Sequence, residues 1–428
     1  MKKYFLNACD IKTMDIDAIM HRKDDARDHV EEVVKSIIDE VKSQGDAALK
    51  KFTIKYDNVT LDHITVPQAE IQEAYRMVES DIVELLKEAA ENIKTFHQEQ
   101  IQATWVKEFS PGISLGQLVT PLQRVGLYVP GGKGGYPSTV LMDAIPALVA
   151  GVPSIALITP PNKNGKVNPY LLVAADLVGI KEIYKVGGAQ GIAALAYGTK
   201  TISPVNKIVG PGNIYVAIAK KLVFGKVDID MIAGPSEICI IADETSKPAF
   251  IAADMLSQAE HDEMATSILI TTKDIYNEVL KEIQKQMNNL SRKDIMEKSI
   301  HNNSKVFIVD SLDTAAALSN LIAPEHLEIM VEDPQVLLKK IIHAGAVFLG
   351  SYSPEPVGDY FAGPNHTLPT SGTAKFSSPL GVYDFVKRTS LIHYQKESLM
   401  NIGSKVIKFA EIEGFTAHAN AIRRRLDD

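Results

Sequence analysis

The sequence is poor in cysteine and carries no excess of positive charge. Its 428 residues include two cysteines, Cys9 and Cys239, so a disulfide framework does not hold this chain together. The formal net charge of -8 gives no reason to expect binding to nucleic acid or to an anionic membrane surface. The basic run at 423–425 indicates the last turn of a helix, where cations meet the negative end of the helix dipole.

Long apolar runs are also missing. No segment approaches the roughly 18 uncharged apolar residues of a membrane span. The first residues carry two lysines, but the apolar stretch that follows ends at Asn7, which is too short for the core of a signal peptide. We therefore expect a cytoplasmic protein that has neither a membrane nor a nucleic acid as partner.

What is present indicates a globular α/β chain with more than one core. The length exceeds what one core usually serves, and 45% hydrophobic with 23% charged residues is ordinary for a globular protein. Residues 24–102 carry apolar positions at helical spacing, with Gly45 ending one helix and Pro67 opening the next. From Arg124 onward, short apolar runs alternate with helical segments.

This alternation predicts parallel sheets joined by helical crossovers, because each strand is followed by a turn and a helix. The first series predicts strands at 125–129, 154–158, 183–186 and 207–209. The second series predicts strands at 238–241, 267–270, 306–309, 327–331 and 346–349. A strand at 390–394 and helices at 397–411 and 416–426 form a small C-terminal unit.

Glycine clusters follow three of the predicted strands of the first series, at 131–135, 187–191 and 210–213. Glycine there lets the backbone approach a ligand, and the helix that follows favours an anion. Glycine for turn geometry alone would explain any one cluster, but three on consecutive strand ends favour a nucleotide or dinucleotide site. Tyr215 replaces the third glycine of the G-x-G-x-x-G fingerprint and no P-loop motif occurs, so the binding mode is a non-standard one.

Two Glu-His pairs, Glu260-His261 and Glu325-His326, are the strongest candidates for chemistry. Gln258 and His261 are three residues apart near the end of a predicted helix and share one of its faces. Three more residues are candidates for the same site, since they lie in predicted loops or near a helix start: Asp359, His366 and His418. Imidazole, carboxylate and amide oxygen suit zinc, but a lone histidine is more often a surface or core residue, and neither H-E-x-x-H nor C-x-x-C occurs.

Taken together and in order, the motifs resemble the histidinol dehydrogenase family. The segments that carry the resemblance are 124–132, 186–190, 210–213, 233–237, 256–261, 323–328, 363–370, 387–390 and 416–418. Any one segment would be weak, whereas the ordered set is specific. The resemblance implies a two-step, NAD-linked oxidation of L-histidinol to L-histidine through the aldehyde, which is the last step of histidine biosynthesis.

The resemblance also implies a role for particular residues. The implied ligands of one Zn²⁺ per subunit are Gln258, His261, Asp359 and His418. The implied acid-base residues are Glu325 and His326. The implied contacts to NAD are Tyr128, Gln190 and Asn213, with Lys133–Tyr136 the segment that varies most within the family. The implied contacts to the substrate are Ser236, Gln258, His261, His326, Asp359, His366, Glu413 and His418.

The fold class expected from pattern and resemblance is α/β, with two Rossmann-like, mostly parallel lobes and small helical extensions at both ends. We expect an N-terminal arm at 1–20, a larger lobe from 21–127 and 238–382, an NAD-binding lobe at 128–237, and a C-terminal unit at 383–428. The family is a homodimer whose terminal units cross to the partner, so Glu413 and His418 would complete the other subunit's site.

The sequence leaves three alternative functions open. A related zinc and NAD dehydrogenase could act on another small polar alcohol, and a substrate assay separates the two. A metal-dependent hydrolase would turn over without NAD, which the three glycine-rich strand ends disfavour. A non-catalytic nucleotide-binding module would not need the intact pair Glu325-His326.

Overall fold

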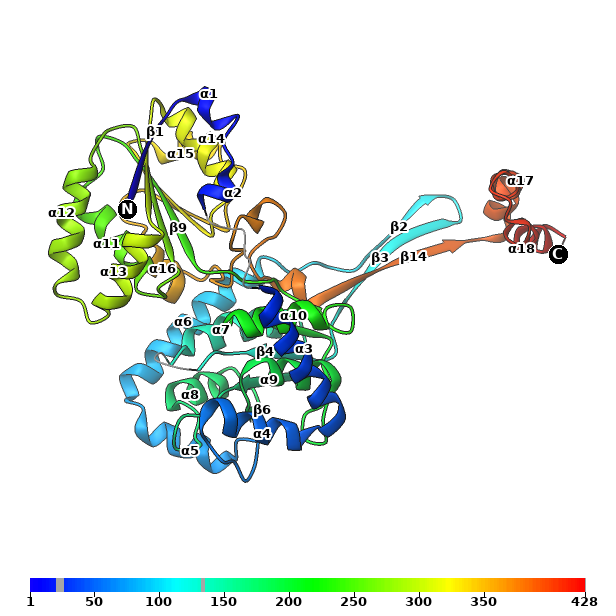
Figure 1. The fold of residues 1–428 in the computed structure, drawn as a ribbon. Helices are drawn as coiled ribbons and strands as arrows, with labels where there is room; N and C mark the ends of the chain where they lie inside the picture. Colours follow the sequence, from blue (N-terminus) through cyan, green and yellow to red (C-terminus); the bar gives the residue numbers. More distant parts are fainter. Residues whose placement is uncertain (21–26, 132–134, 428) are drawn as a thin grey trace.

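The computed structural model describes residues 1–20, 27–131 and 135–427. It consists of an upper lobe, a lower lobe and a long arm that projects from between them (Figure 1). Both lobes are built on parallel sheets, so the expected α/β class with mostly parallel sheets is confirmed. Within the described ranges, no helix is long and apolar enough to cross a membrane.

The upper lobe holds a six-stranded parallel sheet with helices on both faces. The sheet order is β1 (Lys2–Leu6), β11 (Lys305–Val309), β10 (Thr266–Thr271), β9 (Glu237–Ala242), β12 (His326–Met330) and β13 (Ala346–Leu349). Successive residues of β9 point to opposite faces, so Ile238 and Ile240 enter one core while Cys239 and Ile241 enter the other. Cys239 is thus the small core residue expected from its apolar neighbours.

The helices of this lobe divide between the two faces of its sheet. The face that receives Ile240 is covered by α11 (Pro248–Ala259), α12 (Tyr276–Met287) and α13 (Lys293–Asn302). The face that receives Ile241 is covered by α2 (Ile16–Ile19), α14 (Leu312–Ile322) and α15 (Pro334–Leu338), with α1 (Ala8–Ile11) packed beside α14. The short α16 (Glu355–Tyr360) follows the last strand.

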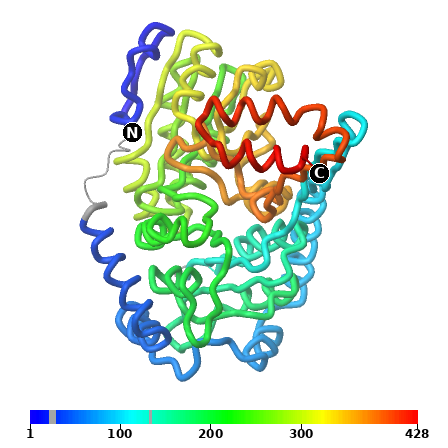
Figure 2. Tube along the Cα trace, turned by 90° about the vertical axis from the view of Figure 1, so that its right-hand side faces the viewer, coloured from blue at the N-terminus to red at the C-terminus, as the bar shows by residue number. Residues whose placement is uncertain are grey.

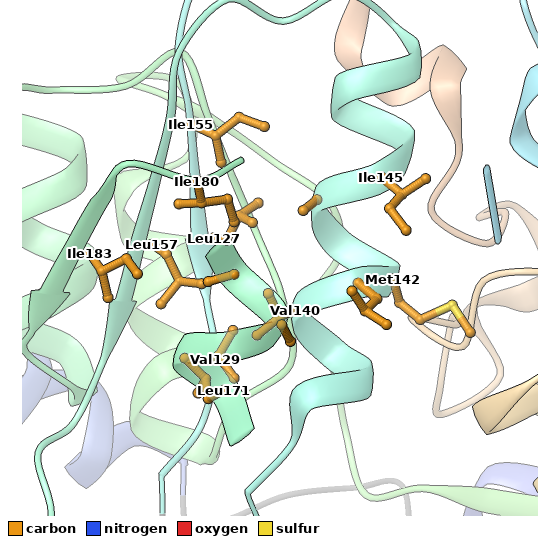
Figure 3. Close-up of a cluster of buried hydrophobic side chains, with 14 of the residues drawn as sticks. Leu127, Val129, Val140, Met142, Ile145, Ile155, Leu157, Leu171, Ile180 and Ile183 are labelled. Atoms are coloured by element: carbon orange, nitrogen blue, oxygen red, sulfur yellow. The ribbon is translucent and has the colours of Figure 1, made fainter. Parts of the chain in front are cut away.

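The lower lobe holds a second parallel sheet. Its order is β6 (Glu182–Lys185), β5 (Ile155–Thr159), β4 (Val125–Tyr128), β7 (Lys207–Val209) and β8 (Asp228–Ile229). One face packs on α5 (Gln68–Met77), α6 (Ser80–Gln98), α7 (Pro137–Val149) and α8 (Pro169–Leu177). The other face packs on α3 (Arg27–Gln44), α4 (Asp46–Asp57), α9 (Gly188–Tyr197) and α10 (Ile214–Val223). Figure 3 shows part of the first core, where Leu127 and Leu157 of the sheet meet Val140 of α7.

The packing of the N-terminal helices differs from the expected division of the chain. Buried apolar residues of the helices between 27 and 98 join the cores of the lower sheet, whereas the expected boundaries placed 21–127 with 238–382. The segment 1–20 is also no separate arm, because β1 pairs in parallel with β11 at the edge of the upper sheet. The periodicity located an apolar stripe on each helix but carried no information on which sheet the stripe would cover.

The arm is an antiparallel sheet of three long strands that ends in two helices. Its order is β14 (Val386–Tyr394), β3 (Ile113–Pro121) and β2 (Trp105–Ser110), and the helices are α17 (Lys396–Ile412) and α18 (Thr416–Leu426). Two short 3-10 helices, η1 (Thr373–Lys375) and η2 (Val382–Phe385), precede β14. The two helices stand clear of both lobes in Figure 1, and in Figure 2, viewed along the arm, they lie in front of them.

A buried ion pair fixes the turn between β7 and α10, which is one of the three glycine clusters. The Lys220 ammonium contacts the Asp230 carboxylate, and both side chains are almost fully buried. The backbone of Gly210 bonds to both partners, since its N–H donates to Asp230 at 2.7 Å and its C=O accepts from Lys220 at 2.9 Å. Gly210 has a φ of +113°, a conformation that side chains disfavour.

Replacing Lys220 with methionine should destabilise the protein strongly, because the Asp230 carboxylate would stay buried without its cation. We expect a loss of about 3–5 kcal/mol in the free energy of unfolding, measured by urea denaturation. Lys221→Met is the matched control, since Lys221 is half-exposed and pairs with Glu31 on the surface, and it should cost less than about 1 kcal/mol. Similar losses in the two variants would contradict this account.

Candidate active site

The backbone of one residue orients both members of the pair Glu325-His326. Glu237 opens β9, and its N–H donates to Glu325 Oε2 at 2.8 Å. His326 opens the neighbouring strand β12, and its Nδ1 lies 3.2 Å from the carbonyl oxygen of Glu237. Because a carbonyl accepts only, Nδ1 carries the proton and Nε2 keeps its lone pair. Nε2 is buried and has no hydrogen-bond partner among the described residues, so it is free to accept a proton.

Other candidate residues lie close enough to this pair to affect its pKa values. Burial raises the pKa of Glu325 well above its usual range, and the carboxylates of Asp359 and Glu355 add to the effect. Burial, together with the imidazoles of His261 and His366, lowers the pKa of His326 to about 3. Burial therefore disfavours the charged form of both groups, the carboxylate of Glu325 and the imidazolium of His326. Such shifts are typical of groups that exchange protons in catalysis.

A cluster with the composition of a metal site lies next to this pair. His261, Glu355 and Asp359 place one ligand atom each within 4.8 Å of one another. Gln258, one turn before His261 at the end of α11, is fully buried, and both atoms of its amide lack a hydrogen-bond partner within the described part of the chain. A buried amide without partners is costly, and a cation would satisfy its oxygen. Gln258, His261 and Asp359 thus fit a zinc ion.

Glu355 belongs to this cluster, and the sequence analysis missed it. It stands four residues before Asp359 on α16, so the two carboxylates share a face of the helix, and that spacing was the available signal. Burial raises the pKa of Glu355 to about 8, and the nearby Asp359 contributes. Ser257 donates to Glu355 at 3.1 Å, which connects α16 to the end of α11.

His366 and Ser236 lie near the pair, and the segment around His366 contacts the lower lobe. His366 Nδ1 is 3.1 Å from the carbonyl oxygen of Asp359, and burial lowers the pKa of its imidazole to about 4. Its neighbours bind α7 of the lower lobe, since Asn365 donates to the Met142 carbonyl and Thr367 donates to Asp143. Ser236 immediately precedes β9 and is partly buried.

Two of the expected site residues are far from the others. Glu413 ends α17 and His418 lies in the first turn of α18, and both are exposed at the tip of the arm (Figure 1). His418 packs beside Phe415 of the same unit. With strands of up to nine residues, the arm reaches about 30 Å, so neither residue joins the cluster of its own chain.

A cavity of about 890 Å³ opens at the carboxyl edge of the lower sheet and brings together the three expected NAD contacts. Tyr128, Gln190 and Asn213 all line it, as do Gly131, Gly135 and Gly188 from the glycine clusters. Tyr128 accepts a hydrogen bond from the N–H of Gly188 at 3.3 Å, and Asn213 caps α10. In the variable segment Lys133–Tyr136, Lys133 and Gly134 lie outside the described residues. The size suits a dinucleotide, and the position suits the ligand sites of open parallel sheets.

Comparison with known proteins agrees with this geometry. A family model described as Histidinol dehydrogenase matches residues 20–426. A histidinol dehydrogenase of Clostridium acetobutylicum is 56% identical over 92% of this chain and 91% of its own length. That of Bacillus subtilis is 52% identical over 92% of both chains. The crystal structure of histidinol dehydrogenase from Elizabethkingia anophelis superposes with a TM-score of 0.94, at 39% identity, over 100% of this chain and 98% of that one. The chain belongs to the histidinol dehydrogenase family.

Proposed function

We propose that this chain catalyses the four-electron oxidation of L-histidinol to L-histidine through L-histidinaldehyde, with NAD as acceptor and one zinc ion per subunit. The observation that carries the proposal is the convergence of two groups: the pair Glu325-His326 and a cluster that fits a metal. The cavity at the edge of the lower sheet supplies room for the dinucleotide. Histidine biosynthesis is the pathway that this reaction completes.

Binding and orientation of the substrate fall to the residues around the cluster. Gln258, His261 and Asp359 would hold the zinc ion, which when bound would fix the amine and imidazole nitrogens of histidinol and so aim the carbinol at the nicotinamide. Burial beside this position suits Ser236 and His366 for substrate contacts. Glu413 offers a carboxylate to a substrate nitrogen.

His326 serves as base in the first step. The alcohol loses a hydride to bound NAD, and its hydroxyl proton passes to Nε2 of His326, whose lone pair is free because Nδ1 donates to Glu237. The neutral state that burial imposes on this imidazole keeps it able to accept a proton at neutral pH. The product of the step is the aldehyde.

Glu325 serves in the second step, where water adds to the aldehyde carbon. Its carboxylate would take a proton from that water while His326 returns its proton to the aldehyde oxygen, which gives the hydrate. With a second NAD in place of the NADH formed, the hydrate would then lose a hydride to NAD and a proton to the neutral His326. The N–H of Glu237 holds one carboxylate oxygen of Glu325, which leaves the other to face the water. Tyr128, Gln190 and Asn213 hold the cofactor in the adjacent cavity.

The arm supports a homodimer in which each site is shared. It carries exposed apolar side chains at Phe109, Ile392, Phe409 and Ile412, which a second subunit would cover. A two-fold pair of arms would bring Glu413 and His418 of each chain to the cluster of the other. Neither nucleic acid nor membrane is a partner in this proposal, and the low cysteine content and net charge of -8 favour the cytoplasm.

Replacing Glu325 with glutamine should impair the aldehyde step far more than the alcohol step, because only the former needs activated water. We expect a loss of about 10²-fold or more in NADH formation from histidinaldehyde, and under about 10-fold from histidinol in single turnovers. Glu332→Gln, at an exposed glutamate just beyond β12, is the control and should leave both rates unchanged. Equal losses in the two steps would remove the water-activating role from Glu325.

Replacing His418 with asparagine should lower the zinc content of the purified protein well below one ion per subunit, because a ligand is lost. Elemental analysis measures this directly. The control is His393→Asn, which changes another exposed histidine of the arm and should keep its zinc. Full zinc occupancy in the His418 variant would exclude His418 as a ligand.

Mixing two inactive variants tests whether the sites are shared. When His261→Asn and His418→Asn subunits are unfolded together and reassembled in equal amounts, half of the dimers should be mixed. Each mixed dimer would then hold one site with both histidines intact, which restores about a quarter of wild-type activity. Self-contained sites would regain none, because every site would lack one histidine. Wild-type protein taken through the same procedure gives the reference.

A further inference from the structure

Helix α4 contributes one wall of the dinucleotide cavity, and its last residue is an aspartate. Tyr56 and Asp57 both line the cavity, together with Val33 and Ile37 of α3. Among the lining residues that the structure describes, Asp57 is the one with a carboxylate, and Lys163 is the one with a cationic side chain. None of the expected NAD contacts comes from this part of the chain.

Asp57 stands in a position that disfavours a carboxylate in three ways. It ends α4, where the helix dipole is negative and repels an anion. Its Oδ2 is buried, and the described residues offer it no hydrogen-bond partner. Burial raises the pKa of the group from 3.8 to about 6, and no cation among the described residues offsets the effect. A residue kept at such a cost is commonly kept for function.

Because Asp57 lines the cavity, a ligand in that cavity could supply the hydrogen-bond donors that its carboxylate lacks. A group that enters it and offers hydroxyl or amine hydrogens would donate to Asp57 and relieve the penalty of burial. The nicotinamide end of the cofactor must reach His326 in the upper lobe, whereas α4 lies on the side of the lower lobe away from the upper one (Figure 1). The adenosine end of the cofactor is therefore the part that faces α4, and its ribose presents two adjacent hydroxyls.

We propose that Asp57 accepts hydrogen bonds from the adenosine ribose hydroxyls and thereby makes the enzyme select NAD over its 2′-phosphorylated form. This inference rests on the proposed NAD-dependent function. An acidic residue on this ribose is the usual device of standard dinucleotide folds, where it follows a strand of the sheet. Here the carboxylate comes instead from a helix that precedes the sheet in sequence. A 2′-phosphate would meet the carboxylate at close range, with unfavourable charge repulsion.

Lys163 does not cancel this selectivity. It lies in the loop between β5 and α8, on the same cavity, and is exposed. Its flexible ammonium can approach either the pyrophosphate or a 2′-phosphate, so it adds affinity for both cofactors. The discrimination between NAD and its 2′-phosphorylated form therefore depends on Asp57, whose contact with a ribose hydroxyl is favourable and whose contact with a 2′-phosphate is unfavourable.

Steady-state kinetics with each cofactor test the proposal on the intact zinc-loaded enzyme with histidinol as substrate. Asp57→Asn should lower kcat/KM for NAD by about 10- to 100-fold, as expected for the loss of a charged hydrogen bond. The ratio of kcat/KM for NAD to that for NADP should fall at least about tenfold, and kcat at saturating NAD should change little. Asp62→Asn is the matched control, since Asp62 is exposed on the same segment, does not line the cavity, and loses the same charge.

Stability in the absence of cofactor separates a ligand-binding role from a structural one. The raised pKa means that ionised Asp57 destabilises the folded state: the penalty is complete above about pH 6, shrinks as the pH falls below that value, and is gone below the usual pKa of 3.8. Asp57→Asn should therefore melt at a higher temperature than wild type at pH 8, with a smaller difference at pH 5. A variant that melts lower and also binds NAD poorly would show a structural role and overturn the proposal, and Asp57→Ser repeats the test with a smaller side chain.

The outcomes also distinguish this proposal from the proposed function. Wild-type protein that forms no NADH from histidinol would refute the proposed function, whereas calorimetric titration with NAD and NADP would still measure the selectivity. Wild-type activity together with unchanged NAD affinity and unchanged cofactor preference in Asp57→Asn would refute the role of Asp57 alone. A loss of preference shared by Asp62→Asn would also overturn it, because a general charge effect would then explain both.

Discussion

The candidate active site depends on the backbone of Glu237, which holds Glu325 through its N–H and His326 through its C=O. That residue lies between two neighbours in the sheet, since β9 pairs with β10 on one side and with β12 on the other. The backbone there can rotate only if these pairings break, so the proposed catalytic pair takes its orientation from the backbone of the sheet. The proton on Nδ1 of the imidazole follows from the same contact, and with it the free lone pair on Nε2.

Buried charged groups are arranged differently at one place in each lobe. In the lower lobe, Lys220 and Asp230 neutralise each other and brace the turn at Gly210. In the upper lobe, Glu328 and Asp359 both lie near the buried Glu355, all three have raised pKa values, and the described residues place no lysine or arginine within ion-pair distance of them. A divalent cation at His261 and Asp359 would offset this accumulation of negative charge. Burial of these acids is therefore what is expected of a protein whose folding is coupled to the binding of a cation.

The sequence predicted the periodic parts of the fold and the local parts of the site. Every strand expected between 125 and 349 is present, because apolar runs of strand length between glycine-rich turns have few other solutions. The exposed strand β2 and the partly buried strand β3 were missed, since neither shows a sustained alternation of apolar and polar residues. Spacing placed Gln258 and His261 on one face. Asp359 and His418 were candidates by residue type, and the resemblance alone assigned them as ligands. The lobe that α3 to α6 cover was predicted wrongly because it depends on long-range packing, and Asp57 gave no signal at all.

The arm has a consequence for how the molecule assembles. The cores of both lobes close without it, because their buried clusters draw on residues of the lobes and not on α17 or α18. Each lobe can therefore fold as a unimolecular event while the arm still carries its apolar side chains in water. In the proposed homodimer, pairing of two arms would come afterwards and would be second order in protein. In a dilute solution, a newly made chain would pass through an interval in which it is folded, stable and catalytically silent.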